Sequence, residues 1–346
     1  MGLQMQEAIL EPDLPIVDAH HHLWHHTLAN GTLHPVIARR PRYLIDEMSA
    51  DLNSGHRIRA TVFVQCRAMY RSEGPEYLKP VGETEFANGA AAMSASGAYG
   101  PTRICAGIVG FADLTVGDAI DEALESHLAA SPRFRGIRQS SPWDADPGVR
   151  GLLSFDTPGL YLSDDFCRGY ARLSKYGLSF DAWLLEPQLP DVIDLAKRFP
   201  ETPIVLDHVG TPLGVATYRG KREERFSIWR RNVRALAKLP NVTVKLGGLG
   251  GDFCNFPSFE ADPPARPEQL AGEWGPYLES CIEAFGPERC MFESNFPVDG
   301  ATCDYATLWN AFKVFAKAYS ADEKAHLFAG TATRFYRLNL PTGATG

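Results

Sequence analysis

The stretch that decides the fold lies near the start of the chain and reads Ile16-Val17-Asp18-Ala19-His20-His21-His22-Leu23-Trp24. In it an apolar run leads directly into a cluster of histidines. Because side chains two apart in a strand point to the same side, we expect His20 and His22 to project together while His21 points aside. Two imidazoles on one side form a natural chelate for a divalent metal. The stretch therefore predicts a buried strand that ends in an active site.

Short runs rich in β-branched and aromatic residues recur along the chain, and segments with apolar residues at helical spacing lie between them. Together with the first run, the predicted strands are residues 15–19, 60–65, 104–111, 134–138, 178–183, 204–208, 242–246 and 290–293. Strand and helix alternating eight times is the pattern of a (β/α)8 TIM barrel, here somewhat distorted. No linker or shift in composition interrupts the series, so we expect residues 1–346 to form a single domain.

Local signals support the helices and point to the catalytic face. Pro190-Asp191 is typical of a helix start, and Ser320 stands three residues before Glu323 as in a capping box. Long loops are predicted after strands 1, 4 and 7, at residues 23–59, 139–160 and 247–266. In a barrel, the loops that follow strands surround the active site. The last of the three contains four glycines within five residues, which favours a mobile lid.

Composition excludes several classes of protein. The net charge of −8 and the pI near 5.7 argue against a nucleic-acid partner, which needs a basic surface. No run approaches the roughly 20 apolar residues of a membrane span. Residues 1–15 contain no Lys or Arg and so lack the start of a secretory signal, which predicts a soluble cytoplasmic protein. The seven cysteines include no CxxC pair, so neither a disulfide framework nor a thiolate zinc site is predicted.

Two further stretches carry candidate chemistry. Residues 203–210 form an apolar run that ends on His208 before a glycine, which predicts a third histidine at the barrel mouth. The neighbouring Asp207 is expected on the other face, where it would orient a partner. On the last strand, Glu293 and Asn295 share a face by the period of two. Two polar side chains at a strand end seldom fill a hydrophobic core, so this pair is a candidate for the active site.

These motifs resemble the amidohydrolase superfamily, in the group of dicarboxypyrone, sulfomuconolactone and sugar-acid lactonases. The resemblance covers the barrel and is carried by residues 18–24, 63–65, 135–138, 178–181, 206–210 and 294–297. It implies a hydrolase that opens a lactone of a sugar acid or an unsaturated carboxylic acid with activated water. Relatives usually have Asp where this chain has Asn295, and that Asp serves as base and, in metal-bearing members, as a ligand. An amide performs neither task as a carboxylate does.

The resemblance does not decide whether the enzyme uses a metal cofactor. Three neutral imidazoles, His20, His22 and His208, can hold one divalent zinc or manganese ion without a carboxylate and keep a position open for water. Some lactonases of this group work without a metal and use histidines and arginines as polarising donors. A metal-bound and a metal-free site are therefore both compatible with the sequence.

Substrate contacts are predicted at other strand ends. The guanidinium of Arg138 matches a carboxylate in two hydrogen bonds, although an ion pair with Asp144 or Asp146 is the alternative. Trp143 and Trp183 are candidates for the walls of the pocket, and Gln65, Asp181 and Lys245, each at or near a strand end, are further candidates for substrate binding. The expected partner is a small acidic or hydroxyl-rich molecule. The sequence does not decide whether the chain forms a homo-oligomer.

With Asn295 among the predicted catalytic residues but unable to take a proton, the base must lie elsewhere. Glu293, Asp181 and a histidine not bound to metal are the alternatives, and the histidine is favoured because its pKa lies near neutral pH. A metal-dependent non-oxidative decarboxylase of an aromatic or unsaturated acid is the second hypothesis, but such enzymes rely on an acidic last-strand residue. A barrel that binds a small acid without catalysis is the third.

Overall fold

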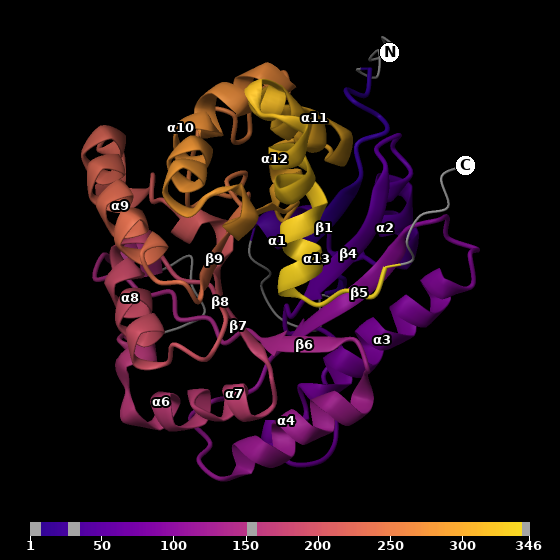
Figure 1. Cartoon of the computed structure of the whole chain (residues 1–346), viewed down its shortest axis with the longest axis vertical. Helices are drawn as coiled ribbons and strands as arrows, with labels where there is room; N and C mark the ends of the chain where they lie inside the picture. The colour runs from indigo at the N-terminus through magenta and orange to yellow at the C-terminus, as the bar shows by residue number, and fades with distance from the viewer. Residues whose placement is uncertain (1–7, 27–34, 151–157, 341–346) are drawn as a thin grey trace.

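The computed structural model describes residues 8–26, 35–150 and 158–340. Eight parallel strands form one sheet, in the order β1 (Ile16–His21), β4 (Ile58–Val64), β5 (Arg103–Gly110), β6 (Phe134–Ile137), β7 (Ser179–Ala182), β8 (Ile204–Leu206), β9 (Val242–Leu246) and β10 (Cys290–Phe292). After β10 the chain passes beside the end of β1, where Phe296 forms an isolated parallel β-bridge with His21. The sheet is thereby a nearly closed barrel, as predicted (Figure 1).

Helices surround the strands, as Figure 1 shows. They include α3 (Val81–Ala95), α4 (Ala119–Ala130), α6 (Asp164–Tyr170), α8 (Leu189–Arg198), α9 (Arg222–Ala237), α10 (Pro267–Phe285) and α11 (Tyr305–Phe315). Two predicted helix starts are confirmed: α8 begins at Leu189 with Pro190 in its first turn, and Ser320 and Glu323 form a capping box before α12 (Ala321–Ala325). The short helix α7 (Arg172–Lys175) follows α6 in the outer layer, whereas α13 (Thr331–Phe335) contacts β1 and β10. None of the helices in the described ranges is long and apolar enough to cross a membrane.

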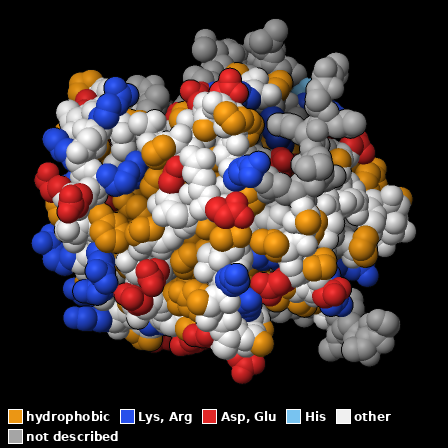
Figure 2. Space-filling view, turned by 90° about the horizontal axis from the view of Figure 1, so that it is seen from above, with side chains coloured by type: hydrophobic (Ala, Val, Ile, Leu, Met, Phe, Trp, Pro, Cys, Tyr) orange, Lys and Arg blue, Asp and Glu red, His pale blue; other side chains and the backbone are white. Residues whose placement is uncertain are grey.

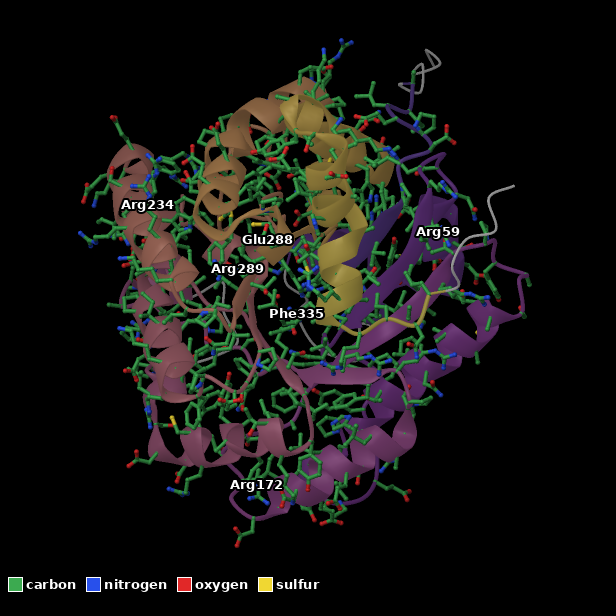
Figure 3. All side chains as sticks on the ribbon, in the orientation of Figure 1. Arg59, Arg172, Arg234, Glu288, Arg289 and Phe335 are labelled. Atoms are coloured by element: carbon green, nitrogen blue, oxygen red, sulfur yellow. The ribbon has the colours of Figure 1, made fainter. Side chains whose placement is uncertain are left out.

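Apolar side chains, most of them alanine and valine, pack inside the barrel. They come from alternate positions of several strands, as the period of two requires, and include Val17, Ala19, Ala60, Val62, Val64, Val109, Val205 and Met291. Tyr336 and Leu338, which follow α13, pack into the same cluster. Because α13 contacts β1 and β10 and crosses in front of the strands, it covers the end of the barrel where the strands begin (Figure 1). Figure 3 labels Arg289, directly before β10, and Phe335 at the end of α13.

The three long loops follow β1, β6 and β9, the first, fourth and seventh strands of the barrel. The first is not structureless: β2 (Trp24–His25) pairs with β3 (Arg42–Tyr43), and the loop also contains α1 (Pro35–Arg39) and α2 (Ile45–Leu52). The second contains α5 (Pro147–Arg150). Residues 27–34 and 151–157 of these two loops lie outside the described ranges. The third loop, residues 247–266, contains no helix or strand.

Charges of both signs share the surface. On the face seen in Figure 2, basic and acidic side chains alternate with apolar ones over the same area. This pattern is compatible with the predicted small-molecule partner.

Candidate active site

The first two histidines reach the barrel mouth through a shift in strand register. Val17 and Ala19 point inward, so strict alternation would send His21 inward too. The pairing of β1 with β4 shifts between Asp18 and His21 and reverses this order. His21 consequently turns outward and its Nε2 lies 2.8 Å from Thr61 Oγ1. The Nε2 atoms of His20 and His22 lie 3.2 Å apart, so these two rings meet as the sequence predicts.

His208 enters the same site from a strained turn. Strand β8 ends at Leu206, and His208 has a φ of +54°, which non-glycine residues rarely adopt. Glu293 holds it in place, with Oε1 2.7 Å from Nδ1 and 3.1 Å from the backbone nitrogen of His208. The His208 ring centre lies 4.7 Å from that of His20. Burial disfavours the imidazolium, but the neighbouring carboxylates, Glu293 foremost, outweigh this effect and raise the pKa of His208.

The ring of His208 needs a glycine opposite it. A Cβ on Gly248 would lie 2.2 Å from the His208 ring, and Gly248 has a φ of +65°. We expect Gly248→Ala to lower the free energy of unfolding by about 1–3 kcal/mol through backbone strain. By displacing His208, it should also reduce kcat/KM by about a hundredfold. Thermal denaturation and steady-state kinetics measure both effects.

Gly251 provides the matched control for this substitution. It lies in the same loop, but an added Cβ there meets nothing within 4 Å. Gly251→Ala should therefore change neither stability nor rate. Equal behaviour of the two variants would show that the loop tolerates a side chain beside His208 and that the histidine position does not depend on Gly248.

Arg138 faces the histidines rather than the loop aspartates. Its Nη2 donates to the backbone oxygen of Gln65, and its Nη1 lies 3.4 Å from His20 Nε2 and 3.5 Å from Asp207 Oδ2. Asp144 instead accepts a hydrogen bond of 2.6 Å from the hydroxyl of Tyr218. Asp146 accepts from backbone nitrogens of Gly148 and Thr217. The proposed ion pair of Arg138 with either loop aspartate is absent from the described residues.

A sealed polar network lies beneath the histidines. Lys245 Nζ lies 2.7 Å from Asp181 Oδ2, 2.9 Å from Asp207 Oδ1 and 3.1 Å from His20 Nδ1. The Tyr336 hydroxyl donates to Asp181 at 2.7 Å. Asp207 orients neighbours as predicted, since it pairs with both Lys245 and Arg138. The prediction that it lies on the other face was wrong, because β8 ends at Leu206 and the alternation of faces stops there. The network thus links Asp181 on β7, Asp207 directly after β8 and Lys245 on β9 to His20 on β1.

Exposure separates the residues that can touch a substrate from those that cannot. Asp181, Asp207, Lys245 and Glu293 are 0% exposed, as is His20. A small exposed fraction of 4–6% remains on the residues that face the opening: His22, Gln65, Arg138, His208 and Asn295. The side-chain oxygen of Gln65 has no hydrogen-bond partner within the described part of the chain. The second set therefore forms the surface that a ligand meets, and the four charged residues of the first set support it. His20 is buried as well, but its Nε2 lies beside that of His22.

Asn295 is oriented by a carboxylate that the sequence analysis did not single out. The Asn295 side-chain nitrogen donates to Asp299 Oδ1 at 2.8 Å, which turns the amide oxygen away from Asp299. Asp299 Oδ2 also accepts from the backbone of Gly250 in the third long loop. Burial, the largest effect, raises the pKa of Asp299 to about 7. The Asn-x-x-x-Asp spacing in the last motif, together with the 3-10 turn at Asp299–Ala301, is the signal that could have identified this pair.

Asp18, on the first strand, binds the segment that follows the last strand. Its carboxylate accepts from the backbone nitrogen and the hydroxyl of Ser294, at 2.9 and 2.6 Å, and from the Tyr305 hydroxyl at 3.0 Å. Desolvation raises its pKa to about 6 despite these bonds. Because Asn295 N also donates to the His20 carbonyl, the two strand ends are locked in register. Asp18 thus positions the two halves of the site.

Two tryptophans follow neighbouring strands of the barrel, Trp143 after β6 and Trp183 after β7. The backbone nitrogen of Trp143, a half-buried residue, donates to Gln188 Oε1 at 2.8 Å. The Trp183 ring meets Phe253 from the third long loop in an edge-to-face contact, with ring centres 6.4 Å apart. Trp183 therefore anchors this loop, whereas a substrate contact by Trp143 stays a prediction.

A group of side chains suited to a metal is present. His20, Asp207 and His208 offer ligand atoms within 4.8 Å of one another. Lys245 already places a cation on the Nδ1 side of His20, between that nitrogen and Asp207. The other side of His20, where its Nε2 faces His22 Nε2, is the side on which a metal fits.

Comparison with known proteins identifies the family. The amidohydrolase family model matches residues 17–338. An uncharacterised protein of Sinorhizobium fredii is 32% identical, with 94% of this chain and 99% of the relative covered. An L-fucono-1,5-lactonase of Burkholderia multivorans is 30% identical over 95% of this chain and 98% of its own length. The crystal structure of a Burkholderia multivorans amidohydrolase with bound zinc superimposes with a TM-score of 0.70, at 28% identity over 93% of this chain and 99% of that one. The chain therefore belongs to the amidohydrolase family and is an enzyme of the hydrolase class.

Proposed function

We propose that this single-domain enzyme opens a lactone of a hydroxyl-rich sugar acid by adding water to the ring carbonyl. The observation that carries the proposal is the convergence of His20, His22, His208 and Arg138 at one mouth of the barrel. The lactonase relative, similar along nearly its whole length, supports the substrate class. We further propose a cytoplasmic location.

The residues fit a divalent metal, zinc or manganese. Two nitrogens bound to one tetrahedral zinc lie about 3.3 Å apart, given Zn–N bonds of about 2.0–2.1 Å. The Nε2 atoms of His20 and His22 are separated by 3.2 Å. His22 donates its Nδ1 hydrogen to the Val64 carbonyl at 2.7 Å, so its Nε2 carries the lone pair that a metal needs. A bound metal would polarise the carbonyl and lower the pKa of water.

His208 is the proton acceptor in this proposal. Asn295 is an amide, and Glu293 and Asp181 are sealed from the opening, so neither alternative base can reach a water there. Glu293 accepts the Nδ1 hydrogen of His208, which leaves Nε2 as the reactive nitrogen, as a carboxylate does in a catalytic triad. We therefore assign His20 and His22 to the metal and keep His208, the third member of the predicted ligand set, as the base.

These residues account for substrate binding and for both proton transfers of the hydrolysis. Arg138 and Gln65 hold the carbonyl or an adjacent hydroxyl of the lactone. The water oxygen bonds to the carbonyl carbon while His208 Nε2 takes the proton. The ring C–O bond then breaks, and His208 returns the proton to the departing alkoxide. Asn295, oriented by Asp299, offers its amide oxygen to the water.

A substrate panel separates this function from the two alternatives. Sugar and unsaturated lactones are assayed by pH indicator, and aromatic acids by release of carbon dioxide. Metal content and ligand-induced thermal stabilisation are measured on the same preparation. We expect hydrolysis of sugar lactones. Decarboxylation would favour the second hypothesis, which the absence of a last-strand Asp argues against, and stabilisation without turnover would favour a binding protein.

The substitution Asn295→Asp tests the last strand. It places a second carboxylate where the amide nitrogen now lies 2.8 Å from Asp299 Oδ1, so the two carboxyl groups will share a proton. At higher pH, where that shared proton is lost, the second negative charge should also raise metal affinity and the pKa of nearby imidazoles. We expect activity to fall and the pH–rate profile to move to higher pH, measured with metal content in parallel.

The double substitution Asn295→Asp/Asp299→Asn is the control. It again provides one amide donor and one carboxylate acceptor, so it should recover the thermal stability that the single change loses. An Asn295→Asp protein that equals the parent in rate, pH dependence and bound metal would place Asn295 outside the chemistry. Hydrolysis gained by Asn295→Asp in a parent without activity would indicate a decayed site.

A further inference from the structure

Lys245 is a buried cation with three partners and no access to solvent. Its Nζ lies near Asp181 Oδ2, Asp207 Oδ1 and His20 Nδ1, at 2.7, 2.9 and 3.1 Å. Two carboxylates, Asp181 and Asp207, lie within 3 Å of this nitrogen, and such a position suits an ammonium group. An ammonium has three hydrogens to donate and no lone pair, so each neighbour must accept.

This contact determines which nitrogen of His20 carries hydrogen. If Nδ1 accepts from Lys245, neutral His20 must hold its hydrogen on Nε2. That nitrogen lies 3.2 Å from His22 Nε2, which is an acceptor because His22 Nδ1 donates to the Val64 carbonyl. Arg138 Nη1 can only donate and would favour a lone pair on His20 Nε2, but it lies farther away, at 3.4 Å, than the two contacts that favour a hydrogen there. The result is one directed chain of donors from Lys245 through His20 and His22 to Val64.

A metal requires the opposite arrangement. Both Nε2 atoms must then offer lone pairs, so the hydrogen of His20 has to move to Nδ1. An acceptor for it is at hand, because Glu293 Oε2 lies 3.0 Å from His20 Nδ1. This buried oxygen has no hydrogen bond of good geometry to any of the described residues. Lys245 would give up its contact with His20 and keep those with Asp181 and Asp207.

We propose that Lys245 is a positioning residue that holds His20 in the tautomer unable to bind a metal, while Glu293 supports the tautomer that binds one. Metal affinity is then set by the competition between Lys245 and Glu293 for the same ring nitrogen. The inference rests on the metal site of the proposed function. It does not depend on which lactone is opened.

The tautomer can be observed directly in the unsubstituted protein. Histidine labelled with nitrogen-15 is incorporated, the metal is removed with a chelator, and long-range proton–nitrogen spectra are recorded. Signals missing from His20→Gln identify His20. We expect an unprotonated Nδ1 and a protonated Nε2. Hydrogen on Nδ1, or on both nitrogens, would overturn the proposal.

Zinc affinity gives the second readout, by competition with a chromophoric chelator. Lys245→Met should bind zinc about tenfold or more tightly than the parent, the size of effect typical of groups behind metal ligands. Lys313→Met is the matched control: Lys313 is also buried, but it contacts His56 and the carbonyls of Leu10 and Glu11. It should leave zinc affinity unchanged.

Unchanged or weaker zinc binding by Lys245→Met, or no binding by either protein, would contradict the proposal. Circular dichroism checks that the variant is folded, and if it does not fold, the spectra of the unsubstituted protein decide the question. Neither experiment uses a lactone. Failure of this inference is therefore distinguishable from failure of the proposed activity.

Discussion

Replacing His22 with Ala is expected to lower kcat/KM for lactone opening by about a thousandfold, the loss typical for a group that stabilises or activates at the reacting centre. The His22 ring is 4% exposed at the mouth, and its Nε2 lies 3.2 Å from that of His20. The substitution removes one of the two nitrogens assigned to the metal. Steady-state kinetics and metal analysis of the purified variant measure the effect.

His25→Ala is the control for this prediction. His25 lies three residues farther along the chain, in β2, and is exposed. Its removal should leave kcat/KM and metal content as in the parent. If His22→Ala kept its activity within tenfold of the parent, the histidine pair would not be the reacting centre.

Arg138→Met is expected to raise KM by about a hundredfold or more. A charged hydrogen bond contributes about 1.5–3 kcal/mol, and a guanidinium can offer two to one acid or diol group. The Nε hydrogen of Arg138 is buried without a partner among the described residues, so the group has capacity left for a ligand. Kinetics over a range of lactone concentrations separate KM from kcat.

The matched substitution is Arg103→Met, at the start of β5, where the side chain is exposed at the opposite end of the barrel. It should not change KM. An Arg138→Met protein with the KM of the parent would assign Arg138 to the internal pairing with Asp207 alone.

The fold could be predicted because its signals are local. Each strand is a short apolar run, and each helix repeats its apolar positions, so the order of elements follows without long-range information. The shared direction of His20 and His22 was also predictable. The register shift that turns them into the barrel was not, because it depends on how β1 pairs with β4.

The support beneath the site was harder to predict. Asp181 and Lys245 were predicted as substrate contacts near strand ends, but they are 0% exposed and pair with each other at 2.7 Å. Sequence periodicity gives the face of a strand but not the depth of a side chain in a barrel. Tyr336 donates to Asp181 from a distant part of the chain, a contact that only the closed fold creates.

The orientation of His208 could not be predicted from the sequence either. The apolar run predicted a strand through residue 208, whereas β8 stops at Leu206 and His208 takes a positive φ. Its ring is held by Glu293 and needs the space left by Gly248, and both lie far away in sequence. The residue type was predictable, but its orientation depends on these partners.

The most direct test of the central claim is lactone hydrolysis in water labelled with oxygen-18. We expect the best lactone of the panel to open well above its spontaneous rate, with the label in the carboxylate of the product and the excess rate lost in His22→Ala. Attack of labelled water at the carbonyl carbon places the oxygen-18 in the carboxylate of the product. Turnover no faster than the spontaneous reaction, or label in the released hydroxyl, would contradict the account.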